Sequence, residues 1–444
     1  MVAGYPAFVR GSRAIWAVLA VALWASGGPA AGQTASAKTV ELRARTVDGK
    51  TVQGTISGWD EAGCSGAFGA IPWTDLPAAE VDRVLRKLTD ASSPDGLLVV
   101  ARALFSTQDG ASRGEALLKQ ALRKDSSLGE KAAAARAAGI EARESSAARR
   151  LRETLPQARE GSGIVTWPIP TPEQREQALK ETRVGIEKAI DPVAKLSGMR
   201  WSFAESEYWL VYGDLAQRDL ADLGKRLDSL YRRVAEMMAL PKGVNIFHGK
   251  AGCVVTSSLW IYRDLEKSMY QWDPPLNIIG LCHYDGPRVV VNAYRDPNDD
   301  AFMSLLVHEA THGFMHRYGT PVQLPMWASE GYCELVAARS FERSTVDALR
   351  RPQGLRYLRG GGSSLPFLQT NGRDGRWPGE DGVGYAVAYL TVCHLIDRHG
   401  DAFGDWVRDV KSGVPWEESL QKRFGMDARQ LSERIDAYYR QNMK

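Results

Sequence analysis

Two histidines that stand four residues apart constrain this chain more than any other feature of its sequence. They belong to the segment HEATH, which runs from His308 through Glu309 to His312. Apolar residues recur around this segment at helical spacing, and residues four apart on a helix share one face. The two imidazoles can therefore be directed at a single ion, and zinc accepts such nitrogens at about 2 Å. Glu309 projects from a neighbouring angle, where a general base acting beside the ion would lie.

A second segment supplies a third candidate ligand. Gly319, Pro321 and Pro325 end the first predicted helix and make a turn, after which WASEG opens another segment of helical character. The spacer between His312 and Glu330 is long enough for a helix end, a loop and an antiparallel return. Glu330 would then complete a set of two histidines and one glutamate, leaving the fourth position of a tetrahedral zinc ion open. The alternative is a solvated helix that carries two histidines by chance.

These segments resemble a known class of enzymes. HEATH followed by WASEG is similar to the gluzincin metallopeptidases, and the form P-x-W-x-x-E-G, from Pro325 to Gly331, is similar to the peptidase MA-like families of secreted bacterial proteins. The resemblance is strong over 300–340 and weaker over 160–444. It implies an α+β, gluzincin-like zincin domain with a mixed sheet and active-site helices, and Glu309 as the catalytic base. The ligands that it implies for Zn2+ are His308, His312 and Glu330.

The resemblance also implies two supporting residues. In related enzymes an acidic residue one turn after the glutamate ligand orients a ligand histidine, and Glu334 occupies that place; a surface carboxylate is the alternative. A tyrosine or histidine further along stabilises the oxyanion, which implies this role for Tyr385, at the start of an apolar helix. Helix packing is the alternative for Tyr385, and His394 is a weaker candidate. His316 lies about 12 Å along the helix axis from His308, too far to share an ion with it.

The N-terminal residues 1–37 have the pattern of a secretory signal peptide. Arg10 and Arg13 precede a short apolar run from Ala14 to Ala25, and small residues suitable for cleavage follow it. The run is too short for a comfortable membrane span. We therefore expect an extracytoplasmic protein, periplasmic or secreted, without a stable membrane span after cleavage. An uncleaved anchor is the alternative.

Changes in composition divide the remaining chain into three parts. Residues 38–80 alternate apolar and polar positions, with a hairpin turn signal at Asp48, which suggests a small SH3-like β module. Residues 81–158 follow helical patterns and are expected to form a helical spacer. Glycines and prolines in 161–172 mark a boundary, and we assign 159–444 to the metallopeptidase-like domain. The two N-terminal modules either bind a protein partner or act only as a linker.

The pattern within the last part predicts further elements. Strands are expected in 201–213, at Ser258–Tyr262 and at Arg288–Asn292. In the resembled family an edge strand such as Arg288–Tyr294 lines the cleft and pairs with an extended substrate; a plain sheet strand is the alternative. Residues 353–384 are rich in glycine, and we expect a long loop there, either a lid over the cleft or an exposed insertion.

Charge and cysteine content narrow the remaining possibilities. A net charge of +3 without a basic block argues against nucleic acid as a partner. The five cysteines form no C-x-x-C pair. Cys253 and Cys282 could form a disulfide in an oxidising compartment, and free, buried thiols are the alternative.

These observations together favour a secreted, zinc-dependent metallopeptidase that hydrolyses peptide or protein substrates. Family aminopeptidases carry a G-x-M-E-N stretch that binds the substrate amine, and its absence from this sequence favours an endopeptidase. The competing interpretation is a catalytically silent protein of zincin fold that serves in binding or assembly at the cell surface. A zinc hydrolase with another substrate is compatible with the same ligands, because the ligands alone do not define the cleft.

Overall fold

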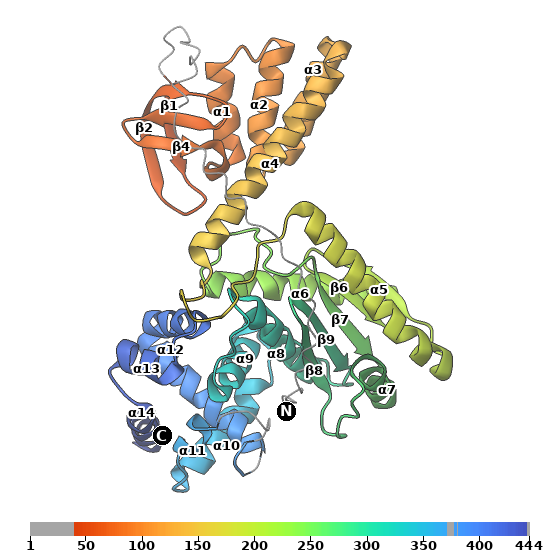
Figure 1. Ribbon diagram of the computed structural model, residues 1–444, viewed down its shortest axis with the longest axis vertical. Helices are drawn as coiled ribbons and strands as arrows, with labels where there is room; N and C mark the ends of the chain where they lie inside the picture. Colours follow the sequence, from red (N-terminus) through yellow and green to blue (C-terminus); the bar gives the residue numbers. More distant parts are fainter. Residues whose placement is uncertain (1–39, 371–376, 380, 442–444) are drawn as a thin grey trace. The chain divides into compact units, whose positions relative to one another are not determined.

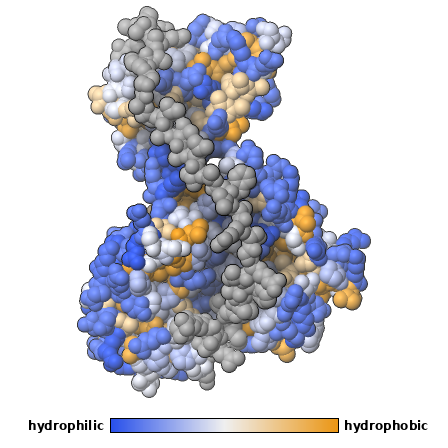
Figure 2. All heavy atoms as spheres, in the orientation of Figure 1, coloured by the Kyte–Doolittle hydropathy of each residue, from blue (hydrophilic) through white to orange (hydrophobic). Residues whose placement is uncertain are grey.

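The computed structural model describes residues 40–370, 377–379 and 381–441, and the fold is mixed α+β with two sheets. The described chain forms two compact units, one of 40–153 with Pro241–Val244 and one of Thr154–Leu240 with 245–441. The predicted signal peptide at 1–37 lies outside the described residues. Within them, no helix is both long and apolar enough to cross a membrane. On the face seen in Figure 2, hydrophobic residues form small, separate patches.

The first unit begins with an antiparallel sheet in the order β1-β2-β3-β4. The predicted turn at Asp48 joins β1 to β2, and Gly49 adopts a φ of 85°, which glycine allows without steric cost. Four α-helices and two short 3-10 helices, η1 and η2, follow the sheet. The bounds are β1 Val40–Arg45, β2 Thr51–Trp59, β3 Gly63–Gly66, β4 Gly69–Pro72, η1 Trp73–Asp75, α1 Ala78–Leu88, α2 Pro94–Ser106, α3 Ala111–Lys124, η2 Ser126–Leu128 and α4 Gly129–Thr154.

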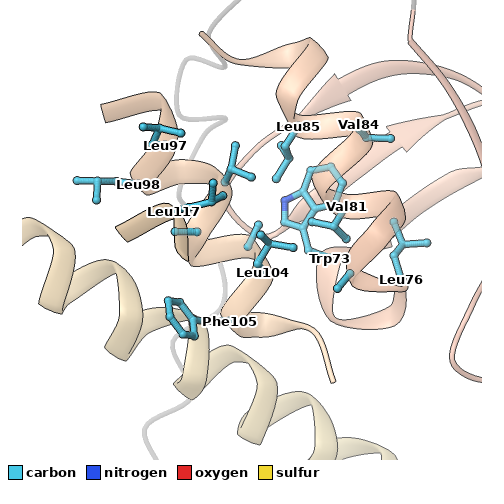
Figure 3. Close-up of a cluster of buried hydrophobic side chains, with 14 of the residues drawn as sticks. Trp73, Leu76, Val81, Val84, Leu85, Leu97, Leu98, Leu104, Phe105 and Leu117 are labelled. Atoms are coloured by element: carbon cyan, nitrogen blue, oxygen red, sulfur yellow. The ribbon is translucent and has the colours of Figure 1, made fainter. Parts of the chain in front are cut away.

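Strands and helices of this unit share one hydrophobic core. Leu42 from the sheet belongs to the same buried cluster as residues of the helices. Figure 3 shows Trp73 from η1 beside Leu85 and Leu104 from the helices. The Trp73 indole also donates a hydrogen bond to the Asp60 carbonyl at 2.9 Å, which ties the core to the β2–β3 turn. The β module and the helical spacer of the sequence analysis therefore pack as a single body.

The second unit contains a five-stranded sheet in the order β5-β6-β7-β9-β8, with parallel pairs at β6-β7 and β7-β9. Helices α5 and α7 cover one face of this sheet, and α6 and α8 cover the other (Figure 1). The bounds are α5 Pro172–Ser197, β5 Ser202–Glu205, β6 Trp209–Gly213, α6 Gln217–Met237, β7 Ala251–Thr256, α7 Leu259–Tyr270, β8 Gly280–Asp285, β9 Arg288–Tyr294 and α8 Asp299–Arg317.

The rest of this unit is helical, and α9 packs against both α8 and α12. Its bounds are α9 Met326–Ser340, α10 Val346–Arg359, α11 Leu365–Leu368, α12 Asp381–Lys411, α13 Trp416–Phe424 and α14 Ala428–Gln441. The long loop predicted over 353–384 is wrong for much of that range, because α10 continues to Arg359 and α11 forms within it. Residues 371–376 and 380 lie outside the described chain.

Two strand predictions need correction. The strand expected at Ser258–Tyr262 is wrong, because α7 starts at Leu259 and buries Tyr262 and Leu265 at helical spacing. The strand at Arg288–Asn292 is confirmed as part of β9. It is not an edge strand, however, since β9 pairs with β7 on one side and β8 on the other. The edge beside α8 is β8.

The cysteines are all free thiols. Cys253 in β7 and Cys282 in β8 both stand opposite Val291 of β9, on its two sides. Two strand spacings separate their Cα atoms by about 10 Å. A disulfide needs Cα atoms within about 7 Å, so the sheet itself prevents this pair from forming.

One glycine allows α9 and α12 to approach closely. A Cβ atom on Gly331 would lie 2.3 Å from the carbonyl oxygen of Ala388, which is rigid backbone. We expect Gly331→Ala to destabilise this unit by about 1–3 kcal/mol, because the helices must separate to admit the methyl group. The matched control is Gly404→Ala in α12, where a Cβ meets nothing within 4 Å. Calorimetry should show a lower unfolding temperature for the first variant only, and equal behaviour would contradict the close packing.

Candidate metal centre

Helix α8 begins at a capping side chain and ends before a glycine turn. These two signals set the position of the HEATH segment within the helix. The Asn298 side chain caps its first turn, accepting hydrogen bonds from the backbone N–H groups of Asp300 and Ala301 at 3.1 Å each. After Arg317 the chain turns at Gly319, whose φ is 78°. Helix α9 then starts after Pro325 and returns along α8. The predicted arrangement of two packed helices joined by a turn is thus present.

Three side chains from these helices converge on one point. Nε2 of His308 lies 3.1 Å from Nε2 of His312 and 3.1 Å from Oε2 of Glu330. The third edge of the triangle, from His312 Nε2 to Glu330 Oε2, is 3.4 Å. Ligand atoms about 2.0–2.1 Å from a tetrahedral zinc ion lie roughly 3.3–3.4 Å from one another. The three atoms therefore fit three corners of such a site, and the group can hold a metal ion.

The surroundings of these ligands carry an excess of negative charge. His308, His312 and Glu330 are at most 9% exposed. Burial lowers the pKa of His308, but the hydrogen bond that His308 donates to Glu330, together with the nearby Glu334 and Glu309, outweighs burial and raises that pKa to about 9. Burial opposes ionisation of Glu330 as well, yet the two histidines hold its pKa well below the usual range. Such a pocket favours a cation, and an ion bound there would displace the imidazole protons.

Each ligand histidine has a polar neighbour on its other nitrogen. Oε1 of Glu334 lies 3.7 Å from Nδ1 of His308, within ion-pair distance, and Arg350 donates a hydrogen bond of 2.8 Å to the same oxygen. Oγ of Ser329 lies 3.4 Å from Nδ1 of His312. Glu334 was predicted for this place from the sequence, whereas Ser329 and Arg350 were not. Ser329 adjoins the glutamate ligand and could have been found there, whereas Arg350 comes from α10, where no local pattern marks it.

Glu309 lies in a cavity beside the three converging atoms. The cavity has a volume of about 480 Å³, and His308, His312, Glu330 and Glu309 all line it. The Glu309 side chain is partly exposed, and its carboxylate forms no hydrogen bond with any other described residue. An unpaired carboxylate at this place is available to take a proton from a molecule bound in the cavity.

Tyr385 borders the same cavity from the start of α12. Its ring centroid lies 6.3 Å from that of His308, and the Arg350 guanidinium carbon lies 5.1 Å from its ring centre. Burial, and then the charges of Glu330 and Glu309, raise the pKa of Tyr385. The phenol therefore remains protonated and can act as a hydrogen-bond donor. Tyr389, one turn later, instead donates to Asp347 at 2.6 Å.

The remaining histidines of the sequence analysis lie elsewhere. His316 donates from Nε2 to the Gly286 carbonyl at 2.9 Å and stacks on Tyr284 with ring centroids 4.1 Å apart. Burial lowers the pKa of His316 to about 4, so this ring is neutral. His394 packs against Tyr438 and does not line the cavity of the metal centre.

Strand β8 forms one wall of the cavity, from Gly280 to Tyr284. A buried polar cluster behind it connects strand, sheet and helix. Glu266 of α7 is fully buried, accepts a hydrogen bond of 2.9 Å from the Asn292 amide, and lies 2.9 Å from Nε2 of His283. These contacts fix β8 to β9 and α7. This cluster was not predicted from the sequence, because its members come from three separate elements.

The contact between Glu334 and His308 leads to a measurable expectation. Glu334→Gln keeps the shape of the side chain but removes the charge that faces Nδ1 of His308 and pairs with Arg350. Residues that support a metal ligand in this way typically contribute about 10–100-fold to metal affinity. We expect a loss of that size for zinc, measured by competition with a chelating dye. Glu342→Gln, at an exposed position beyond α9, is the control, and equal affinities in all three proteins would exclude the supporting role.

Comparison with known proteins identifies no relative of this chain. No model of a known protein family matches the chain, and no curated protein matches it. The functional assignment therefore depends on the residues and their arrangement.

Proposed function

We propose that this chain is a zinc-dependent metallopeptidase that acts on extended peptides as an endopeptidase. The observation that carries the proposal is the convergence of two imidazole nitrogens and one carboxylate oxygen, 3.1–3.4 Å apart, beside an unpaired glutamate in one cavity. A structural zinc site normally has four protein ligands, whereas a catalytic site has three and an open position. The set of His308, His312 and Glu330 corresponds to the second kind.

The residues of the cavity can be given roles in peptide hydrolysis. When bound, zinc would lower the pKa of a coordinated water and polarise the scissile carbonyl. Glu309 accepts the proton of the attacking water and delivers it to the leaving amine. Tyr385 donates a hydrogen bond to the oxygen that gains negative charge. Glu334 and Ser329 hold the two ligand histidines in orientation.

The position of β8 favours a peptide as the substrate. Within the described residues this strand pairs with β9 on one side only, and its residues line the cavity. The free edge of a strand offers backbone N–H and carbonyl groups that an extended peptide can pair with. Such pairing recognises the substrate backbone and so tolerates many side chains. We assign to β8 the role that the sequence analysis gave to Arg288–Tyr294.

The place of action follows from the N-terminal sequence. We propose an extracytoplasmic protein, because the charged start, apolar run and small residues of 1–37 match a signal peptide. The first unit, with its own core, would then be free to bind a protein partner outside the cytoplasm.

The test is metal-dependent cleavage of a mixed peptide library. The protein is stripped with a chelator, divided, and assayed with and without added zinc. We expect internal cuts that appear only in the zinc-loaded sample, and their positions define the specificity. If the loaded protein holds one zinc ion per chain and cuts nothing, the peptidase proposal fails, and the silent binding protein of zincin fold becomes the better account.

A further inference from the structure

A second hollow lies between α12 and α14, on residues that the metal centre does not use. It has a volume of about 560 Å³. The polar side chains that border it are His394, Arg398, His399, Arg434, Tyr438 and Gln441. Arg398 and Arg434 are the permanently charged members of this set, and among the described residues no carboxylate lines the hollow.

The two arginines of this hollow lack acidic partners among the described residues. Arg398 and Arg434 are both exposed, and neither forms an ion pair there. The acid next to Arg398, Asp397, is bound to Arg339 at 2.7 Å. The guanidinium carbon of Arg398 lies 5.1 Å from the centre of the Tyr438 ring. This ring contact and the hydrogen bond between the Arg398 and Tyr438 side chains hold the guanidinium in place, and its remaining N–H groups can donate to an anion.

His394 is the buried residue among those that border the hollow. Its side chain is only 6% exposed, and Nδ1 is enclosed without a hydrogen-bond partner. Its ring centroid lies 4.7 Å from that of Tyr438. Burial, and then the positive charge of Arg398, lower the pKa of His394 to about 4. An anion in the hollow would offset the field that these groups create.

We propose that the hollow between α12 and α14 binds a phosphoryl group, carried by a soluble phosphate monoester or by a lipid headgroup, through Arg398 and Arg434. Guanidinium groups match phosphate oxygens with paired hydrogen bonds, which an ammonium cannot do. The hollow is open to solvent, so it can admit a phosphoryl group that is attached to a larger molecule. None of these residues lines the cavity of the metal centre, so the proposal is independent of peptidase action.

The test measures binding of glycerol 3-phosphate to the full chain by titration calorimetry. Zinc is first removed from the protein with a chelator. Removing zinc prevents the probe from binding at the metal centre. We expect saturable binding at one site that glycerol does not reproduce. The double variant Arg398→Gln/Arg434→Gln should weaken it at least tenfold. Arg429→Gln, an exposed arginine of α14 outside the hollow, should leave it unchanged.

A second arm separates the two sources of the phosphoryl group. Vesicles of phosphatidylglycerol and phosphatidylcholine are sedimented with the native protein and the variants. Binding to vesicles alone, lost in the double variant, assigns a lipid headgroup, and binding of the soluble probe alone assigns a soluble ester. Binding in neither arm, or equal weakening by Arg429→Gln, overturns the proposal. Circular dichroism checks that the double variant is folded. The single variant Arg434→Gln provides a second test if it is not.

Discussion

Glu309→Gln is expected to lower the rate of peptide cleavage by about 10²–10⁴-fold while leaving the affinity for zinc unchanged. The amide has the shape of the carboxylate but cannot accept a proton. The side chain lies outside the triangle of His308, His312 and Glu330, so the metal ligands stay intact. The same variant distinguishes the two functions considered for this chain, because a binding role needs no general base.

The measurement compares turnover of one peptide from the library with the zinc content of each protein. Glu342→Gln serves as the matched control, since Glu342 is exposed and lies outside the cavity. Zinc bound in all three proteins with cleavage lost only in Glu309→Gln would support the assigned role. Cleavage that persists in Glu309→Gln would remove Glu309 as the base, and loss of zinc from that variant would mean that the ligand set is incomplete.

Lys411→Met is expected to destabilise the second unit by an amount on the order of 3 kcal/mol. Lys411 is 1% exposed, and its Nζ donates to the carbonyls of Met315, Thr320 and Val322 at 2.9, 2.5 and 2.8 Å. These carbonyls belong to the end of α8 and to the turn that leads to α9. Methionine fills the space but leaves buried acceptors unsatisfied, at about 1–3 kcal/mol each.

The destabilisation by Lys411→Met should also depend on pH. Burial, and then the charge of Arg317, lower the pKa of Lys411 to about 7 in the folded chain, against 10.5 for an ordinary lysine. Between these values the unfolded state binds more protons, so the stability due to Lys411 rises with pH. The variant should therefore lose more stability at pH 9 than at pH 6. Hydrogen exchange in peptides from α8 and α9 measures both losses, with Lys188→Met as an exposed control. Equal losses at the two pH values would contradict the lowered pKa.

The candidate site could be predicted from the sequence wherever its residues are close along the chain. His308, Glu309 and His312 belong to one helix, and Glu330 stands early in the next, so helical periodicity and one turn suffice to bring them together. In the structure, each of these four residues lines the same cavity. Whether they bind zinc and cleave peptides stays a prediction until the experiments above are done.

Residues that reach the site from distant elements could not be predicted in this way. Arg350 meets Glu334 only because α10 packs beside α9, and Glu266 meets His283 only across the sheet. The loop expected over 353–384 was wrong for a related reason. The glycines 360–362 do interrupt the helices, but the segments on either side become α10 and α11, where Leu358 and Phe367 are buried against neighbouring helices. Which strand forms the edge of the sheet likewise depends on the order of the strands, and local sequence patterns do not reveal that order.

A buried thiol beside the metal centre can be used to measure how often the helices around it separate. Cys333 follows Glu330 on α9, is 0% exposed, and has a pKa that burial and the neighbouring carboxylates raise well above the ordinary value. A thiol reagent can modify it only in molecules whose α9 has separated from its neighbours. In a chain that keeps Cys333 as its single cysteine, the labelling rate would therefore count those separations directly. Added zinc should slow that rate, because the ion ties α9 to α8.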